Sequence, residues 1–151
     1  GERGKTMGSD PEANRCSIIP TLRYYDAPAA IEWLCRAFGF EEHLVVRGED
    51  ASTIIHAQLV RGDAMIMLGS AEAHDNEFAL RVRPAADLGG QTNQSIYVVV
   101  DDADAHYAQA VKAGAEIVME VEDAAYGGRG YGCLDLGGNY WSFGTYDPWA
   151  D

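Results

Sequence analysis

Near the start of the chain, the pattern of apolar and polar residues predicts a strand followed by a helix. Residues 17–25 are apolar, β-branched or aromatic enough to form a strand. Asp26 then stands where a helix N-cap is expected, and apolar side chains recur at helical spacing over residues 29–38. Gly39 occupies the position that ends many helices. The pattern therefore predicts an amphipathic helix that begins and ends at local signals.

Three further strands are expected after this helix. Their ranges are residues 40–46, 53–60 and 64–68, and a tight turn joins the last two. The stretch that follows, residues 69–93, has little periodicity and contains several glycines and a proline. A long connection of this kind is usually functional or mobile.

The same order of patterns recurs in the second half of the chain. Asp102 precedes a helical stretch that contains Ala105 and Val111, and Gly114 ends it. The strands expected around this helix are residues 95–100, 115–121, 131–136 and 140–146. Each half is thus predicted to form a strand, a capped helix and three strands, which is a βαβββ module. An internal repeat of this size is a strong indication of architecture.

The repeat predicts an α+β fold in which two βαβββ modules form a mixed, partly closed sheet around a cleft. Pockets commonly form at such interfaces. A generic α+β domain with coincidental spacing is the alternative. The expected divisions are a flexible N-terminal tail at 1–16, a first module at 17–69, an inter-module loop at 70–93 and a second module at 94–147.

Composition narrows the classes of partner. The chain has 151 residues, 47% of them hydrophobic, which suits one domain with a core. Its 11 basic and 24 acidic residues give a net charge of −13, which disfavours nucleic acid as a partner. The charge would favour a cationic ligand, although solubility explains an acidic surface as well.

Cysteine content and hydropathy bear on the compartment. The three cysteines are odd in number and include no C-x-x-C pair, so a disulfide framework or a zinc knuckle is not expected. Reduced thiols fit a cytoplasmic protein.

No apolar run reaches the roughly 18 residues that a membrane helix needs, so no membrane partner is expected.

Six short motifs, in the correct order, resemble those of the vicinal oxygen chelate superfamily, which has the glyoxalase, bleomycin-resistance protein and extradiol dioxygenase fold. These motifs lie at residues 19–26, 30–40, 62–68, 96–102, 126–129 and 135–143. Leu136 departs from the family pattern, which usually has proline there. The nearest subgroup is the bleomycin-resistance-like or glyoxalase-like one. The resemblance implies a homodimer, sometimes with swapped N-terminal elements, that carries two small-molecule clefts.

The resemblance also locates four strand positions that hold metal ligands in metal-using members, usually His, Glu, His and Glu. Here they are Ile19 or Pro20, Met67, Ser95 and Ser142. None of these side chains is a good ligand for a divalent metal. No metal and no cofactor are therefore expected at the usual site, although a metal bound elsewhere stays possible.

The four histidines are scattered, and His74 and His106 are expected to be solvated. His56 shares a strand face with Gln58, because residues two apart point the same way. That face either lines the cleft or belongs to an ordinary half-exposed strand. The predicted cleft residues are His56, Gln58, Met67, Ser95, Tyr97, Tyr140, Ser142 and Arg129.

Two functions compete for such a cleft. One is a small-molecule-binding protein that sequesters an aromatic or cationic ligand, as bleomycin-resistance proteins do in antibiotic resistance. The other is a lyase, isomerase or dioxygenase of the same superfamily, metal-dependent or with His56 as general base. A dimeric scaffold with a vestigial cleft is a third option. Losing the usual metal ligands favours binding over catalysis.

Overall fold

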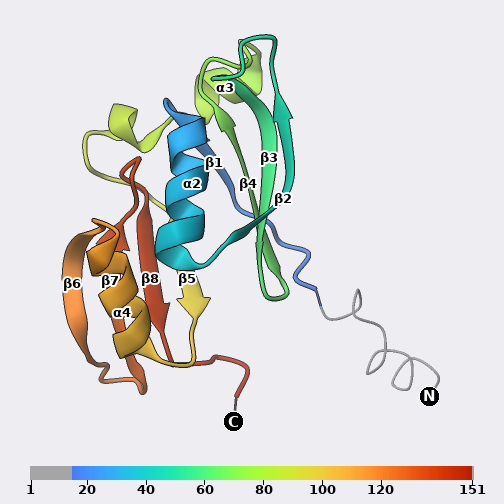
Figure 1. Ribbon diagram of the computed structural model, residues 1–151. Helices are drawn as coiled ribbons and strands as arrows, with labels where there is room; N and C mark the ends of the chain where they lie inside the picture. The colour runs from blue at the N-terminus through green and yellow to red at the C-terminus, as the bar shows by residue number, and fades with distance from the viewer. Residues whose placement is uncertain (1–14, 151) are drawn as a thin grey trace, which may run out of the picture.

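The computed structural model describes residues 15–150, which form two four-stranded mixed sheets with one long helix packed on each (Figure 1). The first sheet has the order β1-β4-β3-β2 and the second β5-β8-β7-β6. In each, the first strand pairs parallel with the last, and the other pairings are antiparallel. The predicted α+β fold of two βαβββ modules is confirmed, but the two sheets stay separate and do not close into one.

The elements of the two modules correspond one to one. Those of the first are β1 Thr21–Tyr24, α2 Ala27–Phe38, β2 Glu41–Arg47, β3 Ile54–Arg61 and β4 Ala64–Ser70. Those of the second are β5 Ile96–Val99, α4 Ala103–Lys112, β6 Glu116–Asp123, β7 Arg129–Leu134 and β8 Tyr140–Gly144. Of the predicted tail, residues 1–14 lie outside the described residues.

Both long helices begin at the predicted caps. The Asp26 carboxylate accepts a 3.2 Å hydrogen bond from the backbone N–H of Ala29, and Asp102 accepts one of 3.0 Å from Ala105. Each bond satisfies a backbone donor that the first helical turn leaves free. Gly39 ends α2 with φ +84°, a left-handed conformation that glycine adopts without steric penalty.

The connection between the modules contains two short elements, α3 Glu77–Arg81 and the 3₁₀ helix η2 Ala85–Leu88. Asn76 caps α3 through a 3.0 Å bond from the backbone N–H of Ala79. Because helices this short contain little more than one turn, they leave no recognisable hydrophobic period in the sequence. Within residues 15–150, no helix has the length and apolar character needed to span a membrane.

The two modules share one core, in which α2 and α4 pack against each other (Figure 1). Phe38 at the end of α2 contacts the second sheet, with ring centroids 4.6 Å from Phe143 and 5.1 Å from Trp141. All three side chains are fully buried. Trp141 and Phe143 therefore pack in the core beneath the helices. The indole N–H of Trp33 also donates a 2.7 Å bond to the backbone carbonyl of Ala113, which ties the helices together.

His106 does not have the solvated position expected from the sequence. Only 8% of it is exposed, its ring stacks on Phe143 with centroids 4.1 Å apart, and its Nδ1 lies 2.6 Å from the hydroxyl of Tyr131. Burial lowers the pKa of His106 to about 4, so the ring is neutral at neutral pH. The expectation was wrong because residues of the first module, which are distant in sequence, cover this part of α4.

Candidate functional site

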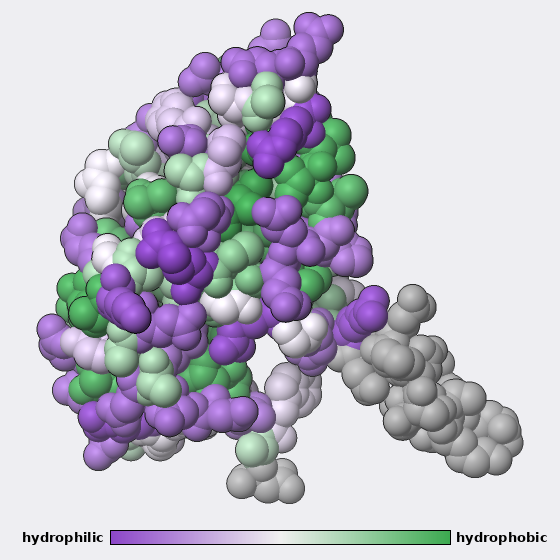
Figure 2. Space-filling model, in the orientation of Figure 1, coloured by the Kyte–Doolittle hydropathy of each residue, from purple (hydrophilic) through white to green (hydrophobic). Residues whose placement is uncertain are grey.

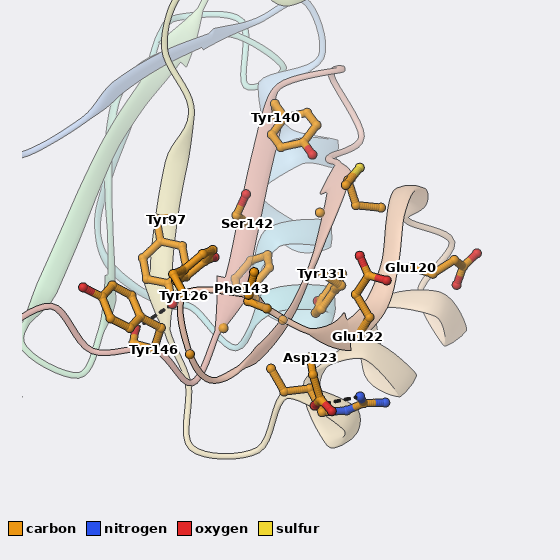
Figure 3. A pocket seen from close by; sticks show the side chains of 18 residues that line it. Tyr97, Glu120, Glu122, Asp123, Tyr126, Tyr131, Tyr140, Ser142, Phe143 and Tyr146 are labelled. Atoms are coloured by element: carbon orange, nitrogen blue, oxygen red, sulfur yellow. Dashed lines mark hydrogen bonds and ion pairs between the residues drawn. The ribbon is translucent and has the colours of Figure 1, made fainter.

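A cavity of about 500 Å³ lies on the open face of the second sheet, the face opposite α4 (Figure 3). All of its lining comes from the second module and the residues just after it. Successive strand residues point to opposite faces, so Tyr140, Ser142 and Gly144 of β8 face the cavity while Trp141 and Phe143 direct their side chains into the core. Alternate residues of β8 therefore contribute to the core on one face of the sheet and to the cavity on the other.

Tyrosine rings laid over glycines form the floor of this cavity. A Cβ added at Gly144 would lie 2.8 Å from the hydroxyl oxygen of Tyr97, and one at Gly132 would lie 3.0 Å from Cζ of Tyr140. Gly132 and Tyr97 are both register partners of Ser142, so each tyrosine reaches its glycine diagonally across a strand pair. The missing side chains let both rings lie against the sheet and leave room above them.

Two further tyrosines stand at the mouth of the cavity (Figure 3). The rings of Tyr126 and Tyr146 meet edge to face with centroids 5.1 Å apart. The hydroxyl of Tyr97 donates a 2.6 Å hydrogen bond to the backbone carbonyl of Tyr146, which fixes the Tyr97 ring. Partial burial, reinforced by nearby tyrosines and Asp147, raises the pKa of Tyr97, so the phenol stays protonated at neutral pH.

The charged groups of the lining differ in whether they have partners. Arg129 forms ion pairs with Asp104 at 3.0 Å and Asp123 at 3.2 Å, and the bonds to these carboxylates raise its pKa. Glu120 accepts a hydrogen bond from the hydroxyl of Tyr107 on α4. Among the described residues, the carboxylate of Glu122 has neither a hydrogen bond nor an ion pair, and Figure 3 shows it pointing into the cavity. The free charge of the site is therefore negative.

The structure divides the predicted cleft residues into two groups. Four of them line this cavity: Tyr97, Tyr140, Ser142 and Arg129. The others do not line it: Ser95 precedes β5, and His56, Gln58 and Met67 lie on the first sheet. His56 Nε2 lies 3.0 Å from the amide nitrogen of Gln58, and Gln58 is the register partner of Met67. These three share the open face of the first sheet, as strand alternation predicts.

The lining also contains residues that were not predicted from the sequence, and Tyr126, Tyr146 and Glu122 are the ones that matter for binding. Tyr126 precedes two glycines in the turn between β6 and β7. This turn is the sequence feature from which an exposed tyrosine beside the sheet could have been predicted. Glu122 follows a β-bulge in β6. A bulge adds a residue to one strand, so the face of the sheet to which Glu122 points cannot be predicted from the alternation of residues.

The donor chemistry of the usual metal positions does not fit a divalent metal. They hold Ile19 or Pro20, Met67, Ser95 and Ser142, which offer no carboxylate or imidazole. Over residues 15–150, no three His, Cys, Asp or Glu side chains gather closely enough to hold a metal ion.

Comparisons with known proteins agree with this architecture. The family model described as Glyoxalase/Bleomycin resistance protein/Dioxygenase superfamily matches residues 17–143. An uncharacterised protein of Mycobacterium tuberculosis, Rv0887c, is 33% identical over 144 residues, which is 95% of this chain and 80% of that protein.

Solved structures show the same fold. TioX from Micromonospora sp. ML1 is 30% identical with a TM-score of 0.64, and the match covers 90% of this chain and 100% of TioX. The bleomycin-binding protein of bleomycin-producing Streptomyces verticillus, solved with copper(II)-bleomycin, has a TM-score of 0.57 at 21% identity. That match covers 87% of this chain and 97% of the bleomycin-binding protein, and it shows likeness of fold alone.

Proposed function

The chain belongs to the glyoxalase, bleomycin resistance protein and dioxygenase superfamily, and we propose that it binds a small aromatic or cationic molecule in the cavity of its second sheet. The observation that carries this proposal is the floor of tyrosine rings, because flat aromatic side chains provide a large contact area with polar edges. The cavity volume of about 500 Å³ lies within the range of small-molecule sites, roughly 300–1,000 Å³.

Binding without chemistry is the role that the site supports best. The superfamily includes enzymes, but the usual metal positions lack ligands here. His56, the candidate general base, contacts the amide of Gln58, and within the described residues no carboxylate orients its ring. The fold shared with a bleomycin-binding protein supports a sequestering role, in which the protein lowers the free concentration of a toxic compound. We place this role in the cytoplasm, where Cys16, Cys35 and Cys133 would remain the free thiols that the structure shows.

The test is a thermal-shift screen of aromatic and cationic compounds, followed by calorimetric titration of those that stabilise the protein. A ligand present at 100 times its Kd should add about 2.7 kcal/mol of stability. Tyr140→Leu should abolish the response, whereas Tyr25→Leu, on the other module, should leave it intact. Binding that survives Tyr140→Leu would place the ligand elsewhere, and conversion of the ligand would show that the protein is an enzyme.

We further propose that the protein acts as a homodimer in which the first sheet of a second copy covers the cavity. Support comes from the open face of the first sheet, where Leu44 and Val46 are 44% and 41% exposed. Figure 2 shows apolar surface at the upper right, where Figure 1 places β2 and β3. On the second sheet, Met119 beside the cavity is 53% exposed. Clustered apolar exposure marks interaction surfaces.

Such a dimer would bring His56, Gln58 and Met67 of the second copy to the tyrosine floor, so that seven of the eight predicted cleft residues would lie together. Light scattering should then give the mass of a dimer. Leu44→Glu should yield monomers with weakened ligand binding, whereas Leu80→Glu, exposed on α3, should change neither property. A wild-type monomer with full ligand affinity would contradict this arrangement.

A further inference from the structure

We propose that the cavity selects a planar aromatic cation, in which the ring lies on Tyr97 and Tyr140 and Glu122 supplies the counter-charge. The inference rests on the proposed function and narrows it, because it requires the ring and the positive charge to belong to one molecule.

The ring requirement follows from how the two tyrosines are held. The hydroxyl end of each ring lies over a glycine, Gly144 for Tyr97 and Gly132 for Tyr140. The 2.6 Å bond to the carbonyl of Tyr146 holds the Tyr97 ring in place. Rings fixed before a ligand arrives lose little conformational entropy on binding, which favours a flat, rigid partner. Both rings belong to the lining, so a planar group can reach their exposed faces (Figure 3).

The sign of the ligand's charge follows from the balance of charges around the rings. Four charged residues belong to the lining: Glu120, Glu122, Asp123 and Arg129. The carboxylate of Glu120 accepts a hydrogen bond from Tyr107 on α4, on the other face of the sheet. Arg129 is already paired with Asp123 and Asp104. Among the described residues, Glu122 is therefore the charged group of the lining that has no partner, and a ligand cation can pair with it.

The tyrosine rings favour the same sign. The face of an aromatic ring carries negative electrostatic potential, which attracts a cation within about 6 Å of the ring centre. A whole-chain charge of −13 adds a long-range field that draws cations and repels anions. An anion would meet the Glu122 carboxylate in the cavity, and within residues 15–150 no free guanidinium or ammonium of the lining would balance it. The tyrosine rings and the carboxylate of Glu122 therefore both favour a planar aromatic cation.

The experiment compares three bicyclic probes of similar shape and different charge by calorimetric titration at about pH 8. N-methylquinolinium carries a fixed positive charge, quinoline is neutral at that pH, and 1-naphthalenesulfonate is an anion. N-methylquinolinium should bind about 10-fold tighter than quinoline, since a cation on an aromatic face with a nearby carboxylate contributes on this order. The sulfonate should bind most weakly. Added salt should reduce the preference for the cation, because it screens the charge on Glu122.

Glu122→Gln tests the assigned counter-charge. It should reduce the preference for N-methylquinolinium to about twofold or less while the affinity for quinoline stays unchanged. Glu116→Gln is the matched control, because Glu116 lies exposed on the same strand, outside the cavity, and the substitution removes the same charge. This control should keep the full preference of the wild type.

The outcomes separate this inference from the proposed function. If quinoline binds as tightly as N-methylquinolinium, or if the sulfonate binds tightest, the inference is overturned while an aromatic binding site remains. An equal loss of preference in Glu116→Gln and Glu122→Gln would also overturn it, since the effect would then come from net charge alone. If none of the three probes binds, both the inference and the proposed function fail.

Discussion

The hydroxyl of Tyr24 in β1 donates a 2.6 Å hydrogen bond to the carboxylate of Asp135, 111 residues further along the chain. The same carboxylate accepts bonds from the backbone N–H of Gly137 and the indole N–H of Trp141. Asp135 is only 6% exposed, so these donors replace the water that would otherwise solvate its charge. Burial and the neighbouring carboxylate raise the pKa of Tyr24 well above its ordinary value, which keeps the phenol a donor. One buried carboxylate thus holds the β7–β8 turn and joins it to the first module.

Removing this link should destabilise the protein. Tyr24→Phe leaves a buried carboxylate with one donor fewer, and we expect a loss of about 1–3 kcal/mol in the free energy of unfolding. Urea unfolding followed by tryptophan fluorescence measures it. Tyr25→Phe is the matched control, because the hydroxyl of Tyr25 bonds to Asp87 at the exposed surface and should matter much less. If both variants lose the same free energy of unfolding, the buried Tyr24–Asp135 bond stabilises the protein no more than the exposed bond of Tyr25.

Stability should fall in mild acid because of His106. The unfolded chain has a histidine with the ordinary pKa of 6.5, whereas the folded chain lowers it to about 4. Between these pH values the unfolded state binds a proton that the folded state does not, so stability is complete above about pH 6.5 and declines toward pH 4. The decline attributable to this residue is at most about 3 kcal/mol.

Unfolding measured from about pH 7 to about pH 4.5 tests this dependence. His106→Gln cannot titrate, so its stability should vary less with pH than that of the wild type. His74→Gln, at an exposed histidine, should retain the wild-type dependence. If the curves for His106→Gln and the wild type run parallel, the acid sensitivity has another origin.

Substitutions at two glycines of the cavity should separate binding from stability. A Cβ at Gly144 would lie 2.8 Å from the hydroxyl of Tyr97, which belongs to a side chain that can rotate away. Gly144→Ala should therefore displace that ring and break its bond to Tyr146, at a cost of about 1 kcal/mol. Binding of an aromatic probe should weaken. A Cβ at Gly130 would instead lie 2.7 Å from the backbone carbonyl oxygen of Phe143, which cannot swing away. Gly130→Ala should therefore destabilise the protein by about 1–3 kcal/mol.

Melting curves and N-methylquinolinium titrations of these two variants provide the comparison. Wild-type affinity in Gly144→Ala would show that the position of the Tyr97 ring is irrelevant to the ligand.

The contact between α2 and α4 should depend on Trp33. Trp33→Phe removes the 2.7 Å hydrogen bond to the carbonyl of Ala113 and part of a side chain that is only 4% exposed. We expect a loss of about 2 kcal/mol or more from the missing bond and the cavity that remains. Trp149→Phe, at a tryptophan that is 95% exposed, should change stability by less than about 0.5 kcal/mol. Chemical denaturation followed by far-ultraviolet circular dichroism measures both.

Features that depend on a few neighbouring residues could be predicted from the sequence. The caps at Asp26 and Asp102 act on backbone groups three residues away. Tyr140 and Ser142 are two residues apart in β8 and were both expected in a cleft, and the structure has them on one face of the strand, with Trp141 on the other. The pattern failed at Glu122, because the bulge in β6 interrupts the alternation, and at α3, which is too short to show a period.

The amino-acid sequence by itself determined the order of the elements, the ends of the long helices and the two faces of most strands, because backbone sterics and local hydrogen bonds set these. Only the tertiary structure decided that Tyr24 reaches Asp135, that His106 is buried and that the open face of the second sheet is hollowed above its tyrosines. The first two depend on residues of different modules that meet when the modules pack. The third depends on strands of the second module that are apart in the sequence and pair in one sheet. Contacts between residues distant in sequence depend on the packing of the whole core, so no short stretch of sequence predicts them.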